Sequence, residues 1–224
     1  MKLSNPIKGY INKKAPNGSV TQWFGENPEL YKAAINLKSH NGIDLVAPYG
    51  TPIYAIASGL VVECKDDASG YGKHVRILCD NEDKKGGYEM TYGHAAQNLV
   101  KIGERVETGQ MIQLMGNTGF VVSDVNALGY WVKGSNKYAG THLHLSIREF
   151  KYDKKGWRYY PNTPKITILN YNNGWNGCFD FAKMFYEDAK LGDVAINKWI
   201  KVDESNAWYK QLFNRLKDYY IGIR

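Results

Sequence analysis

Segments in which apolar and polar residues alternate fill most of the chain from about residue 40 to residue 150. Alternation with a period of two predicts strands that bury one face, and the clearest segments are 60–64, 74–79 and 88–92. Polar turn clusters separate these segments, and single glycines then punctuate the chain at close intervals. So many tight corners predict a mainly β fold, an antiparallel sheet or sandwich, and argue against a βαβ protein.

The C-terminal part has a different pattern, because apolar residues recur there at helical spacing from about Asn176 onward. Ser205 is suited to cap the last of these helices. We therefore divide the 224 residues into an irregular lead-in over 1–19, one domain over 20–165 and a small helical appendage over 166–224. The appendage is expected to pack on the sheet or to bind a protein partner.

The formal net charge of +7 favours anionic partners such as cell-wall polymers, membrane surfaces or nucleic acid. No long run of lysine and arginine occurs, and Asp153 interrupts the most basic stretch, 151–158, which we interpret as a solvated turn. Nucleic acid is therefore not an expected partner. No window of the sequence is apolar enough to predict a transmembrane segment.

Three widely spaced cysteines, Cys64, Cys79 and Cys178, form no Cys-x-x-Cys pair. We expect them to be free thiols in a protein made in the cytoplasm. Charge and proline near Met1 interrupt the apolar stretch that a signal peptide needs. If the protein acts outside the cell, we expect another route to deliver it.

His142 and His144 are two of four histidines that stand in short motifs suited to a metal site. Because they are two residues apart, a strand would place both side chains on one face. The apolar residues Leu143 and Leu145 would then lie on the buried face. Taken alone, this pair fits two histidines on a solvent-exposed face about as well as it fits a functional site.

His40 and Asp44 form the second motif, and the Asn-Gly pair between them with Pro48 beyond favours a turn that enters a strand. Such a turn brings the two side chains together, although this motif alone also fits a capped turn with a surface histidine. His94 is the remaining member. Three imidazole or carboxylate groups suffice for a catalytic Zn²⁺ with an open fourth position, and two further histidines can move protons. The set therefore predicts a zinc hydrolase.

Taken together, these motifs resemble the lysostaphin-type, LytM-like (beta-lytic) zinc metallopeptidases, which cut the peptide part of bacterial peptidoglycan. The resemblance covers about residues 20–147, and its parts occur in the family's order at 20–25, 40–53, 57–62, 70–75, 91–94, 106–112, 115–119 and 141–147. It implies a β domain with a narrow groove that holds the zinc site.

Carried over position by position, the resemblance makes His40, Asp44 and His144 the zinc ligands and His94 and His142 the catalytic histidines. An alternating pair can also give both of its imidazoles to the metal, in which case His142 is a ligand and one of the other three is not. His74, the fifth histidine, matches no such position, and we expect a structural or surface role for it.

Residues 120–140 form a long insertion before the His-x-His segment, where the family usually has a few residues. Long loops in compact domains are often functional. We expect Tyr130, Trp131 or Tyr138 to bind substrate in one wall of the groove. The alternative is an exposed loop whose aromatic side chains pack on one another.

The resemblance implies a zinc-dependent endopeptidase that hydrolyses peptide bonds of peptidoglycan, either in a cross-bridge or in a stem peptide. Without a visible signal peptide, a phage lysin or virion-associated wall hydrolase is the expected setting, with the bacterial cell wall as the site of action. The alternative is a non-catalytic LytM-like scaffold, such as an activator or a structural part of a wall-remodelling or phage tail assembly. Intact ligand positions disfavour that alternative.

Overall fold

The computed structural model describes residues 3–7, 19–68, 70–121 and 138–185. Its strands and helices, in chain order, are β1 (Ser19–Gln22), α1 (Pro28–Ile35), β2 (Ile43–Val46), β3 (Pro52–Tyr54), β4 (Gly59–Asp67), β5 (Gly72–Asp80), β6 (Gly86–Asn98), β7 (Arg105–Val106), β8 (Met111–Met115), β9 (Leu143–Tyr152), β10 (Ile166–Ile168) and α2 (Ala182–Phe185).

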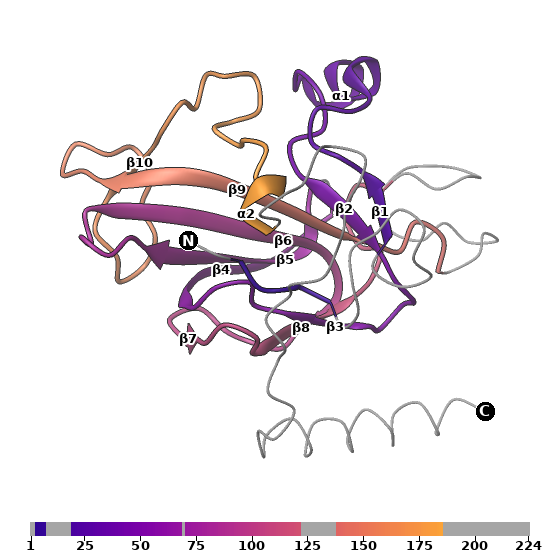
Figure 1. Ribbon diagram of the computed structural model, residues 1–224, viewed down its shortest axis with the longest axis horizontal. Helices are drawn as coiled ribbons and strands as arrows, with labels where there is room; N and C mark the ends of the chain where they lie inside the picture. The colour runs from indigo at the N-terminus through magenta and orange to yellow at the C-terminus, as the bar shows by residue number, and fades with distance from the viewer. Residues whose placement is uncertain (1–2, 8–18, 69, 122–137, 186–224) are drawn as a thin grey trace.

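The strands pair antiparallel in the order β1-β2-β9-β6-β5-β4-β7, as Figure 1 shows. Strand β10 adds to β9, while β8 pairs with both β3 and β6. The central strands β5, β6 and β9 contain 9, 13 and 10 residues. The prediction of a mainly β, antiparallel fold is confirmed.

The alternation along β9 divides the sheet into an apolar face and a polar face. Leu143, Leu145 and Ile147 are fully buried in the main hydrophobic core. The residues between them, His144 and Ser146, point to the opposite face because successive side chains on a strand alternate. One strand thus holds the core together and presents the polar residues from which the site is built.

The sheet extends beyond both expected boundaries of the central domain. On the N-terminal side, Ile7 is 1% exposed, belongs to the main core and forms a β-bridge with Ile53. On the C-terminal side, β10 pairs with β9 across the expected boundary at 165/166. The chain then runs mostly through turns, and Phe181 is fully buried in the core. Residues 166–181 are therefore part of the β domain.

The helical appendage was expected to span 166–224, but its described part is helical only at α2. Residues 186–224 lie outside the described residues, so the helix around Ser205 stays a prediction. No helix in the described ranges is long and apolar enough to cross a membrane. The three cysteines are free thiols.

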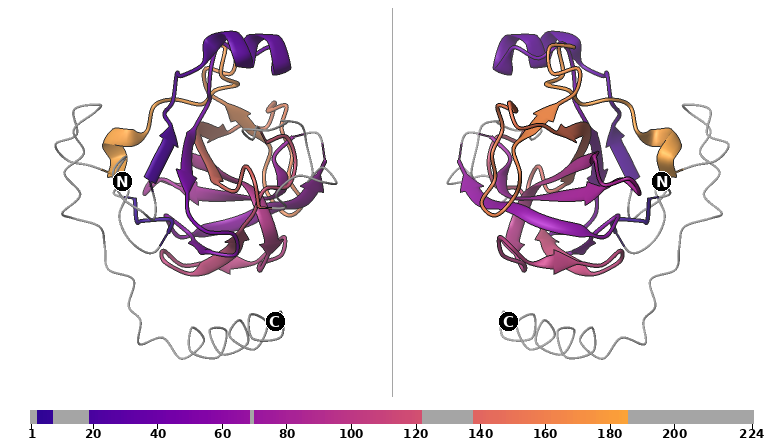
Figure 2. Two further views of the ribbon diagram at one scale, coloured as in Figure 1. Left: turned by 90° about the vertical axis from the view of Figure 1, so that its right-hand side faces the viewer. Right: turned by 90° about the vertical axis from the view of Figure 1, so that its left-hand side faces the viewer.

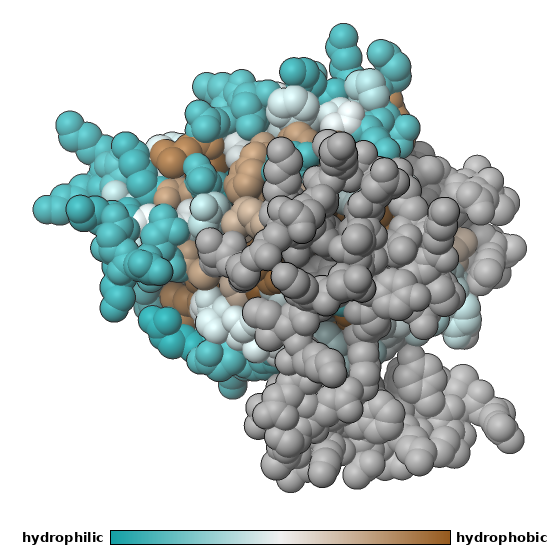
Figure 3. Space-filling model, viewed as in Figure 1, coloured by the Kyte–Doolittle hydropathy of each residue, from teal (hydrophilic) through white to brown (hydrophobic). Residues whose placement is uncertain are grey.

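Helix α1 is an element that the strand pattern does not predict. Pro28 stands in its first turn, and Asn36 ends it in a left-handed conformation with φ of 54°. Figure 2 shows the helix at one end of the molecule, beyond the sheet and close to the segment that follows β10. On the side shown in Figure 3, hydrophilic residues occupy much of the outer edge, with apolar residues between them.

Candidate metal centre and active site

The register of the sheet brings together residues that are far apart in the sequence. Strand β2 pairs with β9 so that Asp44 lies opposite His144, and β9 pairs with β6 so that His144 lies opposite Gly93. His40 stands just before β2 and is completely buried. His40, Asp44 and His144 therefore meet at one end of the polar face.

Three potential ligand atoms converge at this point. His144 Nδ1 lies 2.9 Å from Asp44 Oδ1 and 3.0 Å from His40 Nε2, and the distance from His40 Nε2 to Asp44 Oδ1 is 3.1 Å. These residues form the group of buried side chains in the described structure that is arranged to hold a metal ion. We call His40, Asp44 and His144 the metal centre.

The backbone fixes the orientation of His40. Its Nδ1 lies 3.0 Å from the carbonyl oxygen of Trp23, which can only accept, so this nitrogen donates. In the neutral ring, Nε2 of His40 then carries a lone pair. This lone pair faces Oδ1 of the Asp44 carboxylate, which also carries no hydrogen. Lone pairs aimed at one another repel unless a cation lies between them.

Zinc fits this donor set, because it accepts imidazole nitrogen and carboxylate oxygen at about 2.0–2.2 Å, which separates tetrahedral ligand atoms by about 3.3 Å. The observed separations are close to that value. His144 Nε2 is buried without a hydrogen-bond partner in the described structure, so the ring depends on its Nδ1 for polar contacts. Gly42 makes room for this ring, since a Cβ there would lie 2.8 Å from Nε2.

His94 and His142 lie beside the metal centre, with their ring centroids 4.6 Å apart. His94 Nδ1 donates to the carbonyl of Thr118 at 2.8 Å, and His142 Nδ1 donates to the carbonyl of Gly140 at 2.7 Å. In the neutral rings each Nε2 is then free to accept a proton. His142 Nε2 is 3.8 Å from Asp44 Oδ2, and His142 is not part of the three-residue metal centre.

Burial and neighbouring charges set the protonation states of this site. Burial acts to raise the pKa of Asp44, but His142 and His40 outweigh it and hold the pKa well below its usual range. Burial, together with His142 and His144, holds the pKa of His94 well below the ordinary value. Asp44 is therefore ionised and His94 neutral at neutral pH, which suits a ligand and a proton acceptor.

Two tyrosines belong to this neighbourhood although the sequence pattern gave them no role. The ring of Tyr31, on α1, lies 5.2 Å from that of His40, and its hydroxyl donates to Gln22 at 2.8 Å. Burial and the Asp44 carboxylate raise the pKa of Tyr31. The ring of Tyr71 lies 5.3 Å from that of His144. Tyr31 was missed because its segment lacks the strand pattern, whereas Tyr71 stands inside a recognised motif and could have been noted.

Of the aromatic residues predicted to bind substrate, Tyr130 and Trp131 lie outside the described residues. Tyr138 is 46% exposed, and its ring lies 5.1 Å from that of Tyr49. The carbonyl of Tyr138 accepts a hydrogen bond from the Thr141 hydroxyl at 2.7 Å, just before the His-x-His segment. Tyr138 is thus close to the site along the chain, and its role toward substrate stays a prediction.

His74 lies outside the metal centre and is 3% exposed. Its Nδ1 is 2.8 Å from the carbonyl of Gly72, and its Nε2 is 2.9 Å from Glu63 Oε1. Both ring nitrogens are engaged by the fold, so His74 has structural partners and is not at the surface.

Comparison with known proteins identifies relatives of the described domain. The profile of Peptidase family M23 matches residues 38–157, which is more than half of the chain. Peptidoglycan DD-endopeptidase ShyC of Vibrio cholerae is 38% identical over 112 residues, which make up 50% of this chain and 24% of that protein. Glycyl-glycine endopeptidase ALE-1 of Staphylococcus capitis is 33% identical over 118 residues, 50% of this chain and 31% of that protein.

Among solved structures, the catalytic domain of the prophage-encoded M23 protein EnpA from Enterococcus faecalis shares 30% identity with a TM-score of 0.43. The match covers 65% of this chain and 90% of that one. The chain spans about a quarter to a third of the length of the two curated relatives described above.

Proposed function

The chain belongs to peptidase family M23, and on that premise we propose that it is a zinc-dependent endopeptidase of bacterial peptidoglycan. His40, Asp44 and His144 would hold the zinc ion, and His94 and His142 would move protons. The observation that carries this proposal is the convergence of three buried ligand atoms within 3.1 Å of one another beside two further histidines.

A zinc ion bound there would supply Lewis-acid chemistry, polarising the carbonyl of the cleaved bond and activating water. The chain's own residues would do the rest. His94 Nε2 or His142 Nε2 would take the proton of the attacking water and return it to the leaving amine. The hydrogen bonds from Nδ1 to the carbonyls of Thr118 and Gly140 would keep both rings in the tautomer that accepts at Nε2.

The proposed substrate class follows from the names of the relatives, which include a peptidoglycan DD-endopeptidase and a glycyl-glycine endopeptidase. Both a stem peptide and a glycine cross-bridge are therefore candidate targets. The net charge of +7 suits a wall polymer that carries negative charge. Peptidoglycan is the proposed partner, and residues 166–224 would supply any contact with a protein partner.

The proposed place of action is the bacterial cell wall, where the enzyme would work as a phage lysin or a virion component. The alternative, a non-catalytic scaffold or activator in a wall-remodelling or tail assembly, needs neither the metal centre nor the free Nε2 atoms of His94 and His142. Their joint presence in one buried site favours the enzyme.

The decisive experiment incubates the zinc-loaded protein with purified walls that contain either direct or glycine cross-bridges and identifies the released fragments by mass spectrometry. We expect new amino termini from one class of peptide bond. The His94→Ala protein, which keeps the metal ligands, is the matched control. Release of no fragment from any wall, with zinc bound stoichiometrically, would favour the scaffold.

A further inference from the structure

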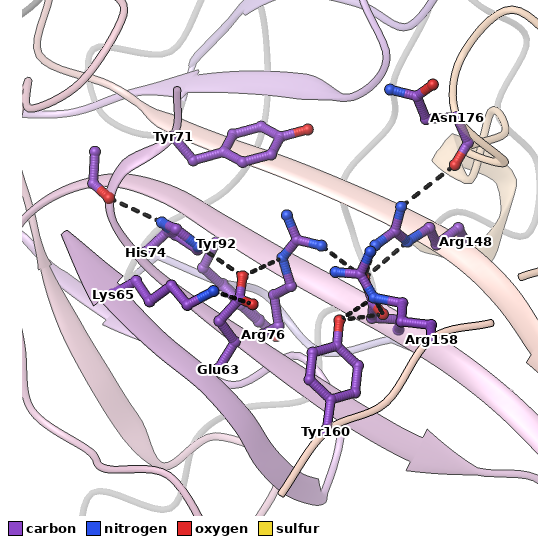
Figure 4. Close-up of polar contacts among 12 residues, drawn as sticks. Glu63, Lys65, Tyr71, His74, Arg76, Tyr92, Arg148, Arg158, Tyr160 and Asn176 are labelled. Atoms are coloured by element: carbon purple, nitrogen blue, oxygen red, sulfur yellow. Dashed lines mark hydrogen bonds and ion pairs between the residues drawn. The ribbon is translucent and has the colours of Figure 1, made fainter. Parts of the chain in front are cut away.

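A second group of polar side chains lies on the same face of the sheet as the metal centre. It contains two carboxylates, four permanently charged basic side chains and one histidine, and we call it the charged cluster (Figure 4). Its members are Glu63, Lys65, His74, Arg76, Glu89, Arg148 and Arg158. They come from β4, β5, β6, β9 and the loop after β9.

Glu89 is the centre of this cluster and is fully buried. Its Oε1 accepts hydrogen bonds from Arg148 Nε at 2.7 Å, from Arg148 Nη2 and from Arg76 Nη1 at 3.2 Å. Its Oε2 accepts from the Tyr160 hydroxyl at 2.7 Å and lies 3.3 Å from Arg158 Nε. A single carboxylate therefore serves three guanidinium groups.

Glu63 is shared in the same way. It lies 2.9 Å from Lys65 Nζ, 2.9 Å from His74 Nε2 and 3.0 Å from Arg76 Nε. The side chain of Lys65 is 61% exposed and stays in water, whereas the three arginines, at 9–20% exposure, exceed the two carboxylates by one charge before His74 is considered. A charge removed from water is costly unless an opposite charge compensates it, so this excess favours an anion at the cluster.

The cluster also has donors to offer such an anion. A guanidinium group has five N–H donors. Within the described residues, Arg158 uses only its Nε, and Arg76 has no partner for Nη2. The side chains of Arg158 and Arg76 are 20% and 12% exposed, so solvent reaches both. Two adjacent guanidinium groups that are partly desolvated and incompletely paired suit the two oxygens of a carboxylate.

The position of the cluster ties it to the metal centre. Arg148 is four residues from His144 on β9, a separation of about 13 Å along the strand. The ring of Tyr71 bridges the two, since it lies 5.3 Å from that of His144 and 5.7 Å from Arg76 Cζ. An extended peptide covers the same distance in about four residues. A peptide whose cleaved bond lies at the metal centre is therefore long enough to reach the cluster about four residues away.

We propose that the charged cluster is a carboxylate-binding subsite for the substrate peptide. A peptide with its cleaved bond at the metal centre would place a free carboxylate, three or four residues away, on Arg158 and Arg76. The cluster would then select peptides that carry a negative charge at that distance and disfavour their amidated forms. This proposal rests on the proposed peptidase function and adds the chemistry of its substrate.

The carboxylate can come from a side chain or from the C-terminus of the peptide, and the test separates these sources. Matched peptides carry either group as a free acid or as a carboxamide, and kcat/KM is measured for each with the zinc-loaded protein. We expect the wild type to prefer one acid over its carboxamide by about tenfold or more, as for a hydrogen-bonded charged pair. The source whose acid form is preferred is the ligand of the cluster.

Arg158→Gln should bring this preference close to one, and stoichiometric zinc in the same preparation shows that the metal centre is intact. Arg158→Lys keeps the charge without the planar fork and should retain only part of the preference. Arg105→Gln, at an exposed arginine on β7, is the matched control and should behave as the wild type. Equal acid-to-carboxamide ratios in the wild type and Arg158→Gln would overturn the subsite.

Failure of the peptidase proposal gives a different result, because no peptide would then be cleaved. In that case the Kd of each peptide for the wild type and for Arg158→Gln, measured by calorimetry, tests the subsite directly. Tighter binding of the acid that Arg158→Gln abolishes would support it. Equal binding of acid and carboxamide to the wild type would overturn it.

Discussion

The metal centre and the charged cluster lie on one face of one sheet and favour ligands of opposite charge. In the metal centre, potential ligand atoms of His40, Asp44 and His144 converge, an arrangement that favours a bound cation. In the charged cluster, three guanidinium groups share Glu89, and positive charge exceeds negative charge. The metal centre therefore suits a cation, and the charged cluster suits an anion.

This contrast shows how burial can make a polar group specific. A buried polar group needs no ligand when the fold supplies all of its hydrogen-bond and charge partners. A buried polar group that lacks such a partner favours binding of a ligand that supplies it. The two groups would together select a substrate that presents a carbonyl at one point and a carboxylate at another. Their separation is set by the registers of β9 with β2 and β6.

The largest expected effect is on zinc binding, which should depend on the metal centre and not on the charged cluster. His144→Ala removes one of three ligand atoms and should abolish both stoichiometric zinc and hydrolysis. His74→Gln changes a histidine of the charged cluster and should keep the zinc. Metal analysis of both purified proteins checks this, and full zinc occupancy in His144→Ala would refute the assignment of the metal centre.

The next effect concerns histidines that touch the metal centre without belonging to it. His94→Ala and His142→Ala should keep zinc yet lose hydrolysis by about 100- to 10,000-fold, because each removes a group that moves protons. Zinc content and kcat are measured on the same preparations. Loss of zinc from His142→Ala would instead make both members of the His-x-His pair ligands.

A substitution in the charged cluster should have its strongest effect on the free energy of unfolding. Glu89→Gln leaves three guanidinium groups around a neutral side chain and should lower the free energy of unfolding by about 3–5 kcal/mol. Glu82→Gln, at an exposed turn, is the control and should change it by less than about 0.5 kcal/mol. Urea unfolding measures both. A loss in Glu89→Gln no larger than in the control would show that solvent already screens the cluster.

Acid should weaken the two groups in different pH windows in the zinc-free protein. Burial lowers the pKa values of His94 and His144, so the unfolded chain takes up their protons first and stability falls as the pH drops below about 6.5. The nearby arginines outweigh burial and lower the pKa of Glu89, so its contribution is present above about pH 4.5 and is lost below it.

Urea unfolding between pH 7.5 and 3 reveals both windows. His94→Ala should flatten the upper one, and Glu89→Gln should flatten the lower one. A wild-type stability that does not change between pH 7 and pH 5 would contradict the histidine part of this prediction.

The smallest effect is expected at Tyr71, which touches both groups. Tyr71→Phe removes the hydroxyl that accepts a hydrogen bond from Asn41 at 3.1 Å and should cost about 0.5–1.5 kcal/mol of stability. Zinc content should not change, since the ring stays between His144 and Arg76. Tyr171→Phe, at a 38% exposed side chain, is the control. A loss of zinc in Tyr71→Phe would mean that the hydroxyl positions the metal centre.

The sequence predicts the metal centre better than it predicts the charged cluster, for a physical reason. A His-x-His segment with apolar neighbours predicts a strand and its polar face, and β9 begins at Leu143, so it contains His144 while His142 precedes it at an isolated bridge with Gly116. That Asp44 would face His144 depends on the pairing of strands about 100 residues apart, which alternation alone does not reveal. Here the family resemblance supplied what local pattern could not.

The charged cluster has no comparable local motif. Glu89 and Arg148 alternate with apolar residues, as they would on a solvent-exposed face, and only the pairing of β6 with β9 shows that they meet. The basic stretch 151–158 is typical of a solvated turn, yet the side chain of Arg158 at its end turns inward and is only 20% exposed. A charged residue in a strand is predicted to be exposed, and only the fold shows whether a partner of opposite charge allows it to be buried.

The backbone at His94 has a consequence for how this protein can change over time. Its φ of 65° places a residue with a Cβ in the left-handed region, which costs about 1–2 kcal/mol that a glycine would largely avoid. The strain turns the imidazole toward its neighbours at a bulge in β6. Selection for activity and selection for stability therefore oppose each other at this position. Glycine at this position would relieve the backbone cost but would also lose the buried ring and its hydrogen bond to the Thr118 carbonyl, so the packing of the imidazole helps to hold the strained backbone.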